Sequence, residues 1–165
     1  MRNRIALVTL LSAAAPAAAH VTLTEPNAKP GAAYIAQFRV GHGCSGSPTV
    51  ALRVEIPEGV SNVRPQPAPG WTMQSENAGK RVKSVTWSGS SLAADQPGLF
   101  AIALTLPSTT GALLFPATQT CEKGVEQWSG LPAADGSPVK NPAPVLTVSP
   151  TPAKAPDMTM PGMKM

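Results

Sequence analysis

Apolar and polar residues alternate in short runs along most of this chain. The clearest run is 50–56, in which Val50, Leu52, Val54 and Ile56 fall on one face of an extended strand. Proline and glycine, with 19 and 14 residues, separate such runs at intervals too short for helices. The expected strands cover 21–24, 34–40, 50–56, 82–88, 98–106, 113–119, 124–128 and 145–148. Short strands bounded by turn residues predict an all-β sandwich or barrel.

The positions of the prolines agree with this interpretation. Pro57, Pro107 and Pro116 lie at or near the ends of expected strands, where no hydrogen bond of a sheet is lost. The proline-rich segment 64–70 is expected to be an extended connection. Residues 149–165 have no apolar period and are expected to be a flexible tail.

The beginning of the chain is typical of an export signal. Arg2 and Arg4 precede a short apolar stretch, and Ala17-Ala18-Ala19 supplies the small residues that a signal peptidase reads. The apolar stretch is too short to cross a bilayer, and no cysteine lies near the cleavage point, so no membrane or lipid anchor is expected. We therefore predict a secreted, periplasmic protein, cleaved after Ala19.

The charge of the chain changes with this cleavage. The formal net charge of the whole chain is +4, and the loss of Arg2 and Arg4 lowers it to +2. The remaining lysines and arginines are scattered, with no basic patch interleaved with aromatic residues. Nucleic acid is therefore not an expected partner.

The sequence has two cysteines, Cys44 and Cys121, which lie 77 residues apart. An even number of cysteines in an exported chain favours a disulfide bond, whereas a redox pair or a thiolate metal site more often has closely spaced cysteines. A bridge that closes so long a loop stabilises a protein by roughly 3–5 kcal/mol.

The sequence has only two histidines, and one of them follows the predicted cleavage point. His20 would then offer an α-amine and an imidazole, two nitrogen donors that together chelate one metal ion, and such donors suit Cu(II). His42, flanked by Gly41 and Gly43, would supply a third nitrogen, the arrangement called a histidine brace. The alternative is that cleavage leaves a histidine first by coincidence and that His42 is simply solvated.

The last eight residues contain four methionines, Met158, Met160, Met163 and Met165. A thioether is a soft ligand that selects Cu(I), and methionines on a hydrophilic tail do not fill a core. The alternative is that the composition of a chain end has drifted. The histidine site and the tail both indicate copper.

Motifs of common enzymes are absent from the sequence. It has no G-x-S-x-G elbow, no phosphate-binding glycine loop and no H-E-x-x-H. Three acids, Glu25, Glu122 and Glu126, would approach a metal only if their strands end nearby, and each is expected to be a surface charge.

The three tryptophans are expected in different surroundings. Trp71 and Trp87 are expected to fill the core or its edges. Trp128 follows Cys121 by a few residues, so a Cys44–Cys121 bridge would bring it near the loop of His42, where we expect it to pack over the metal.

A series of spaced motifs lies within about residues 20–146 of the chain. In order they are 20–23 (HVTL), 42–44 (HGC), 46–49 (GSPT), 54–60 (VEIPEGV), 69–71 (PGW), 86–89 (TWSG), 115–124 (FPATQTCEKG), Trp128 and 142–144 (PAP). This series resembles the YcnI family of exported copper-binding domains. The resemblance implies a β-sandwich that binds Cu(II) through His20, with Trp128 close to the ion and a role in periplasmic copper handling.

One branch of that family adds a glutamate from the loop that reads Gly41-His42-Gly43-Cys44 here. This loop has no acid. We expect His42 to take the place of that ligand, and a carboxylate from elsewhere in the chain is the alternative.

The sequence thus predicts an immunoglobulin-like or cupredoxin-like β-sandwich over 20–148, between a signal peptide (1–19) and a disordered Pro/Met-rich tail (149–165). The predicted function is non-enzymatic copper homeostasis: a metallochaperone or buffer that holds Cu(II) at His20 and Cu(I) at the tail. Its expected partners are other periplasmic copper chaperones or a membrane copper transporter. The alternatives are a copper-dependent oxidative enzyme, which the scarcity of aromatic residues disfavours, and a metal-free immunoglobulin-like interaction module.

Overall fold

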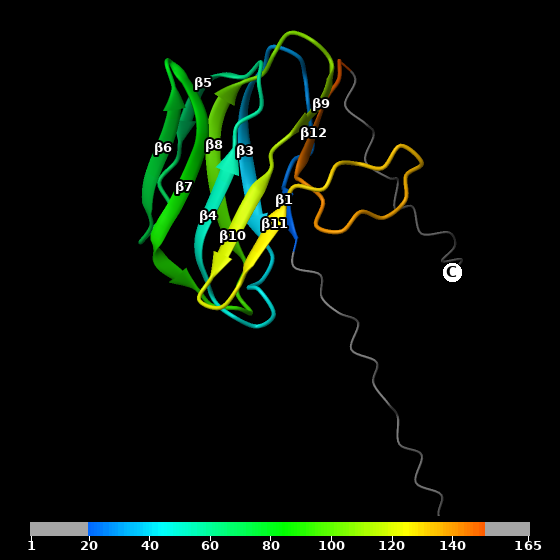
Figure 1. Cartoon of the computed structure of the whole chain (residues 1–165). Helices are drawn as coiled ribbons and strands as arrows, with labels where there is room; N and C mark the ends of the chain where they lie inside the picture. The colour runs from blue at the N-terminus through cyan, green and yellow to red at the C-terminus, as the bar shows by residue number, and fades with distance from the viewer. Residues whose placement is uncertain (1–19, 151–165) are drawn as a thin grey trace, which may run out of the picture.

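The computed structural model describes residues 20–150, which form strands joined by turns and bends with no helix among them (Figure 1). The predicted signal peptide and the four tail methionines lie outside these described residues. The strands are β1 (Val21–Leu23), β2 (Asn27–Ala28), β3 (Ala33–Val40), β4 (Thr49–Glu55), β5 (Ser61–Pro65), β6 (Thr72–Ala78), β7 (Arg81–Leu92), β8 (Gly98–Thr105), β9 (Gly111–Leu114), β10 (Ala117–Cys121), β11 (Val125–Trp128) and β12 (Val145–Val148). The predicted all-β fold class is confirmed.

Two antiparallel sheets form the layers of a sandwich (Figure 1). One has the strand order β1-β3-β8-β5 and the other β11-β10-β4-β7-β6. A third, three-stranded sheet of order β2-β12-β9 contributes Leu146 and Val148 to the same core. β1 and β11 are edge strands of the two layers and lie on the same side of the molecule (Figure 1). The candidate functional site lies beside these two edges.

Aromatic side chains join the two layers across the core. The ring of Phe100 lies 5.0 Å from that of Trp71 and 5.4 Å from that of Trp87, and the ring of Phe38 lies 5.5 Å from that of Phe115. Trp87, Phe38 and Phe115 are fully buried, as strand alternation and large apolar area favour. Trp87 thus lies in the core and Trp71 packs against it, as the sequence predicts.

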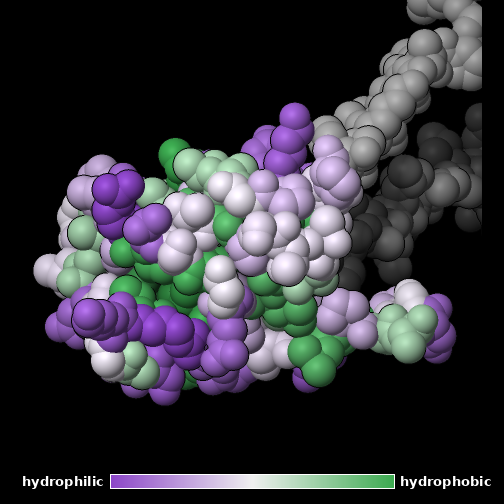
Figure 2. All heavy atoms as spheres, turned by 90° about the horizontal axis from the view of Figure 1, so that it is seen from above, coloured by the Kyte–Doolittle hydropathy of each residue, from purple (hydrophilic) through white to green (hydrophobic). Residues whose placement is uncertain are grey.

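A view from above shows how hydrophobic and hydrophilic residues are distributed over one face of the molecule (Figure 2). In Figure 2 hydrophobic residues lie along the middle of the molecule, and hydrophilic residues gather around them. Among the described residues, no helix is long and apolar enough to cross a membrane.

The strand prediction is wrong in one place where the chain changes sheets. Residues 113–119 were expected to form one strand, but they belong to β9 and β10, with Phe115 and Pro116 between them. Proline lacks the N–H that a continuous ladder needs, so the pairing stops there. β9 then pairs with β12, whereas β10 pairs with β4 and β11.

Three further strands carry too little apolar alternation to be predicted. β6 is exposed along its whole length, and β2 has only two residues. The connection expected over 64–70 is also wrong at its start, because Arg64 and Pro65 complete β5. β5 lies at the edge of its sheet, which is where a strand tolerates proline.

Candidate functional site

The loop between β3 and β4 is tied down by a disulfide bond. Cys44 and Cys121 are bridged, with an S–S distance of 2.08 Å and a Cα–Cα distance of 6.0 Å, so the predicted pairing is confirmed. Both cysteines are buried, and the backbone N–H of Cys44 donates to Sγ of Cys121 at 3.0 Å. The loop that carries His42 is therefore fixed to the end of β10.

Close backbone packing holds the same loop from its other side. The N–H of Gly43 donates to the carbonyl oxygen of Ala94 at 2.9 Å. A Cβ atom at Gly43 would lie 1.9 Å from the carbonyl oxygen of Ser47 and 3.1 Å from Cα of Ala94. Only glycine fits this close approach, so the sequence Gly41-His42-Gly43-Cys44 folds the residue after His42 into the body of the domain.

The imidazole of His42 presents its two nitrogen atoms differently. Nδ1 lies 3.1 Å from the carbonyl oxygen of Gly43, and a carbonyl oxygen only accepts, so the neutral ring carries its proton on Nδ1. Nε2 is then left with a lone pair. It is buried and has no hydrogen-bond partner within the described part of the chain. Buried polar atoms nearly always have a hydrogen-bond partner, so the lone pair of Nε2 is placed to bind a donor or a metal ion.

His20 enters the site from the start of β1. Val21 pairs with Val40 in the register of β1 and β3, and the N–H of Gly41 donates to the carbonyl oxygen of His20 at 3.4 Å. The His20 ring faces the indole of Trp128, with ring centroids 5.5 Å apart and the planes tilted by 39°. The structure thus brings the residue at the predicted cleavage point beside both the His42 loop and Trp128.

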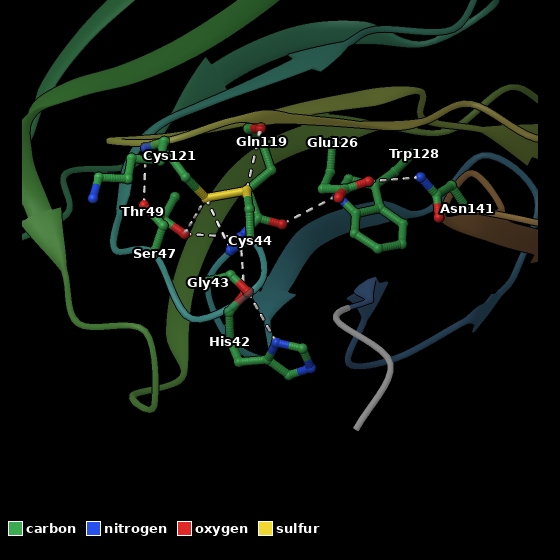
Figure 3. The surroundings of a disulfide bond; sticks show 11 residues. His42, Gly43, Cys44, Ser47, Thr49, Gln119, Cys121, Glu126, Trp128 and Asn141 are labelled. Atoms are coloured by element: carbon green, nitrogen blue, oxygen red, sulfur yellow. Dashed lines mark hydrogen bonds between the residues drawn. A yellow bond between two sulfur atoms is a disulfide. The ribbon is translucent and has the colours of Figure 1, made fainter. Parts of the chain in front are cut away.

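A buried amide connects Trp128 with the His42 loop (Figure 3). Gln119 of β10 is fully buried, and its Oε1 accepts a hydrogen bond from Nε1 of Trp128 at 3.1 Å. Its Nε2 donates to the carbonyl oxygen of His42 at 2.9 Å and to Oγ1 of Thr49 at 2.8 Å. Gln119 could not be predicted as a site residue from the sequence, because an amide on a strand gives no functional signal until its neighbours are known.

A cleft of about 520 Å³ lies at the edge of the sandwich. Its walls include His20, His42, Trp128, Cys44 and Glu126. Figure 3 shows the His42 ring turned away from the disulfide, towards the side on which Trp128 lies. The structure therefore brings together all three residues predicted for the folded metal site, whereas the methionines predicted for Cu(I) lie outside the described residues.

Glu126 is not the surface charge that was expected. It is half-buried, and its Oε2 accepts a hydrogen bond at 2.9 Å from Nδ2 of Asn141, which also lines the cleft. Strand alternation was the available signal, because residues 126 and 128 of one strand face the same side. Glu25 and Glu122 are exposed and do not line this cleft, as expected of surface charges.

Residues 20–150 contain no group of three His, Cys, Asp or Glu side chains that could hold a metal ion. The two histidines supply two imidazoles. A third strong donor at this site would therefore have to be another kind of group, such as an α-amine.

The fold and the cleft define an immunoglobulin-like β-sandwich with a polar site beside the edge strands β1 and β11 of its two layers. The chain belongs to the family described as domain of unknown function DUF1775, whose profile matches residues 20–148. It is similar to an uncharacterized protein from Nocardia farcinica, whose crystal structure reveals an immunoglobulin-like fold. The two are 34% identical with a TM-score of 0.70, and the match covers 80% of this chain and 99% of the other. No curated protein matches this chain.

Proposed function

We propose that this protein binds Cu(II) in the periplasm through the N-terminal histidine that signal cleavage creates, and that it buffers or delivers copper without catalysing a reaction. The observation that carries the proposal is the buried, partnerless Nε2 of His42 in a cleft that His20 also lines. A lone pair held in this way is the usual state of a metal-binding imidazole whose other nitrogen is hydrogen-bonded to a carbonyl.

The donor set fits copper. His20 would supply its α-amine and imidazole after cleavage, and His42 would supply Nε2. Nitrogen donors favour Cu(II), which also binds such sites more tightly than the other divalent ions of its row. Because one donor is an α-amine, the proposal does not require a cluster of three side chains.

The neighbours of the donors suit a binding role. The Trp128 indole faces the His20 ring, and it would limit the access of solvent to a bound ion on that side. Copper bound here would be a cargo, and the open cleft would let a partner exchange it. The methionine tail would hold Cu(I) and pass it to other periplasmic chaperones or to a membrane copper transporter, because thioethers favour the reduced ion.

An electron paramagnetic resonance titration tests the site directly. Protein that begins at His20 is compared with protein that carries one extra N-terminal residue. We expect one Cu(II) per chain with a tetragonal, nitrogen-rich spectrum in the first and loss of that spectrum in the second. The same spectrum in both, or none in either, would contradict the proposal.

Tryptophan fluorescence locates the ion within the cleft. Bound Cu(II) quenches nearby indoles, so Trp128→Phe should remove most of the quenching, whereas Trp71→Phe should leave it. Trp71 is the matched control because it packs on Phe100 and does not line the cleft. Quenching that survives in Trp128→Phe would place the metal elsewhere.

A further inference from the structure

The hydrogen bonds of Gln119 directly link two parts of the proposed copper site that lie on different elements of the fold. Trp128 belongs to β11, whereas His42 belongs to the loop before β4. Gln119 lies on β10, directly between these strands in the sheet. In the strand registers it opposes Glu126 on one side and Leu52 on the other.

The amide of Gln119 has little freedom to turn. Its oxygen accepts from the Trp128 indole, and its nitrogen donates both hydrogens, to the His42 carbonyl and to Thr49 Oγ1. A flipped amide would place its N–H groups against the indole N–H, a donor against a donor. The residue is 0% exposed, so water does not replace any of these bonds.

We propose that Gln119 is a positioning residue of the copper site, which sets the spacing between the Trp128 indole and the imidazole of His42. This proposal rests on the function proposed above. Gln119 does not need to touch the metal. Its side chain holds the backbone carbonyl of His42, and it also holds the Trp128 indole that faces the ring of His20. Partners of this kind that orient ligands typically change metal affinity 10–100-fold when they are removed.

Two substitutions distinguish the hydrogen bond of Gln119 to Trp128 from its hydrogen bond to the His42 carbonyl. Gln119→Met keeps the approximate shape of the side chain and removes all three hydrogen bonds. Gln119→Glu keeps an acceptor for the Trp128 indole, but it loses at least one of the two donated bonds, because a carboxyl group donates one hydrogen at most. Thr118→Val is the matched control, since Thr118 neighbours Gln119 on β10 and bonds Gln127 on the exposed surface.

The first measurement uses metal-free protein and follows the indole N–H signals by nuclear magnetic resonance, with Trp128→Phe to assign the signal of Trp128. We expect Gln119→Met to shift that signal and to speed its hydrogen exchange at least about 10-fold, because the buried acceptor is lost. We expect Gln119→Glu and Thr118→Val to retain a protected signal. A protected, unshifted signal in Gln119→Met would overturn the proposal.

The second measurement adds Cu(II) to protein that begins at His20. Both Gln119 variants should bind Cu(II) about 10–100-fold more weakly and give altered paramagnetic resonance spectra, whereas Thr118→Val should match the unsubstituted protein. Variants that melt at lower temperature but keep the original spectrum and affinity would show a merely structural role and overturn the inference. If the unsubstituted protein itself binds no Cu(II), the proposed function fails instead.

Discussion

Single side chains in this domain owe their chemical state to their immediate surroundings. Tyr34 on β3 is half-buried, and its hydroxyl donates to the carbonyl oxygen of Glu25 at 2.5 Å. Burial, with a smaller effect from the charge of Glu25, raises the pKa of Tyr34 to about 12. Burial has this effect because the charged phenolate loses water that the neutral phenol needs less.

Titration of the phenol tests this state. Tyr34 is the only tyrosine in the chain, so the ultraviolet absorbance of tyrosinate reports it alone. The folded protein should ionise near pH 12 and the unfolded chain near 10. The stability linked to Tyr34 is then complete below about pH 10 and is lost as the pH rises towards 12, because the unfolded chain releases its proton first. Tyr34→Phe should remove this loss of stability between about pH 10 and 12. A titration midpoint near pH 10 for Tyr34 in the folded protein would contradict the raised pKa.

The sequence identified some residues of the site and missed others for a chemical reason. His20, His42 and Trp128 could be named because their types are rare in this chain and their positions are unusual. Gln119 and Asn141 could not, since an amide gains a role only from the atoms that the fold places around it.

At the scale of the elements, the packing of loops and strands positions the residues of the candidate site. The loop between β3 and β4 presents His42, and it is compact because the backbone at Gly43 lies against Ser47 and Ala94. Alternation predicted the buried strands well, because a strand with one face in the core must alternate. It missed β5 and β6, where most or all residues are exposed or partly exposed.

Two glycines of one loop give a matched test. In Gly43→Ala the new Cβ would overlap the Ser47 carbonyl oxygen at 1.9 Å, so the backbone must move. We expect a loss of about 1–3 kcal/mol in the free energy of unfolding, measured by denaturant titration, and weaker Cu(II) binding. Gly41→Ala is the control, because its new methyl group would lie 3.5 and 3.7 Å from the nearest atoms, which is ordinary contact. Equal stability of the two variants would argue against a tightly packed loop.

At the scale of the whole molecule, four separate stretches of the chain meet at one edge of the sandwich. His20, the His42 loop, the β10–β11 pair and Asn141 belong to separate stretches of the chain. Strand pairing within each of the two sheets positions the first three, and the bridge between Gly130 and Pro142 holds the chain next to Asn141. The prediction of fold class succeeded because it depends on repeated local signals. The shape of the cleft depends on long-range pairing, which alternation alone does not reveal.

The disulfide is the covalent link that supports this assembly. Replacing both cysteines, in Cys44→Ala/Cys121→Ala, should lower the free energy of unfolding by about 2–5 kcal/mol and weaken Cu(II) binding through the released His42 loop. Since both sulfur-bearing residues are buried, a thiol reductant should open the bond in the native protein far more slowly than in denaturant. Mass spectrometry after alkylation measures this difference. Equal rates in both conditions would contradict the buried position.

The register of β1 would make the predicted signal cleavage decisive for the proposed function. Val21 is paired with Val40, so the position of the residue before it is set by the sheet. One residue of a strand spans about 3.3 Å, so a cut at the next bond would displace the α-amine by about that distance. This displacement exceeds the length of a metal–nitrogen bond, about 2 Å. Under the proposed function, a signal peptidase that cut one bond early or late would yield a correctly folded but copper-free domain. The accuracy of a single proteolytic cut would then decide what fraction of the secreted molecules is active.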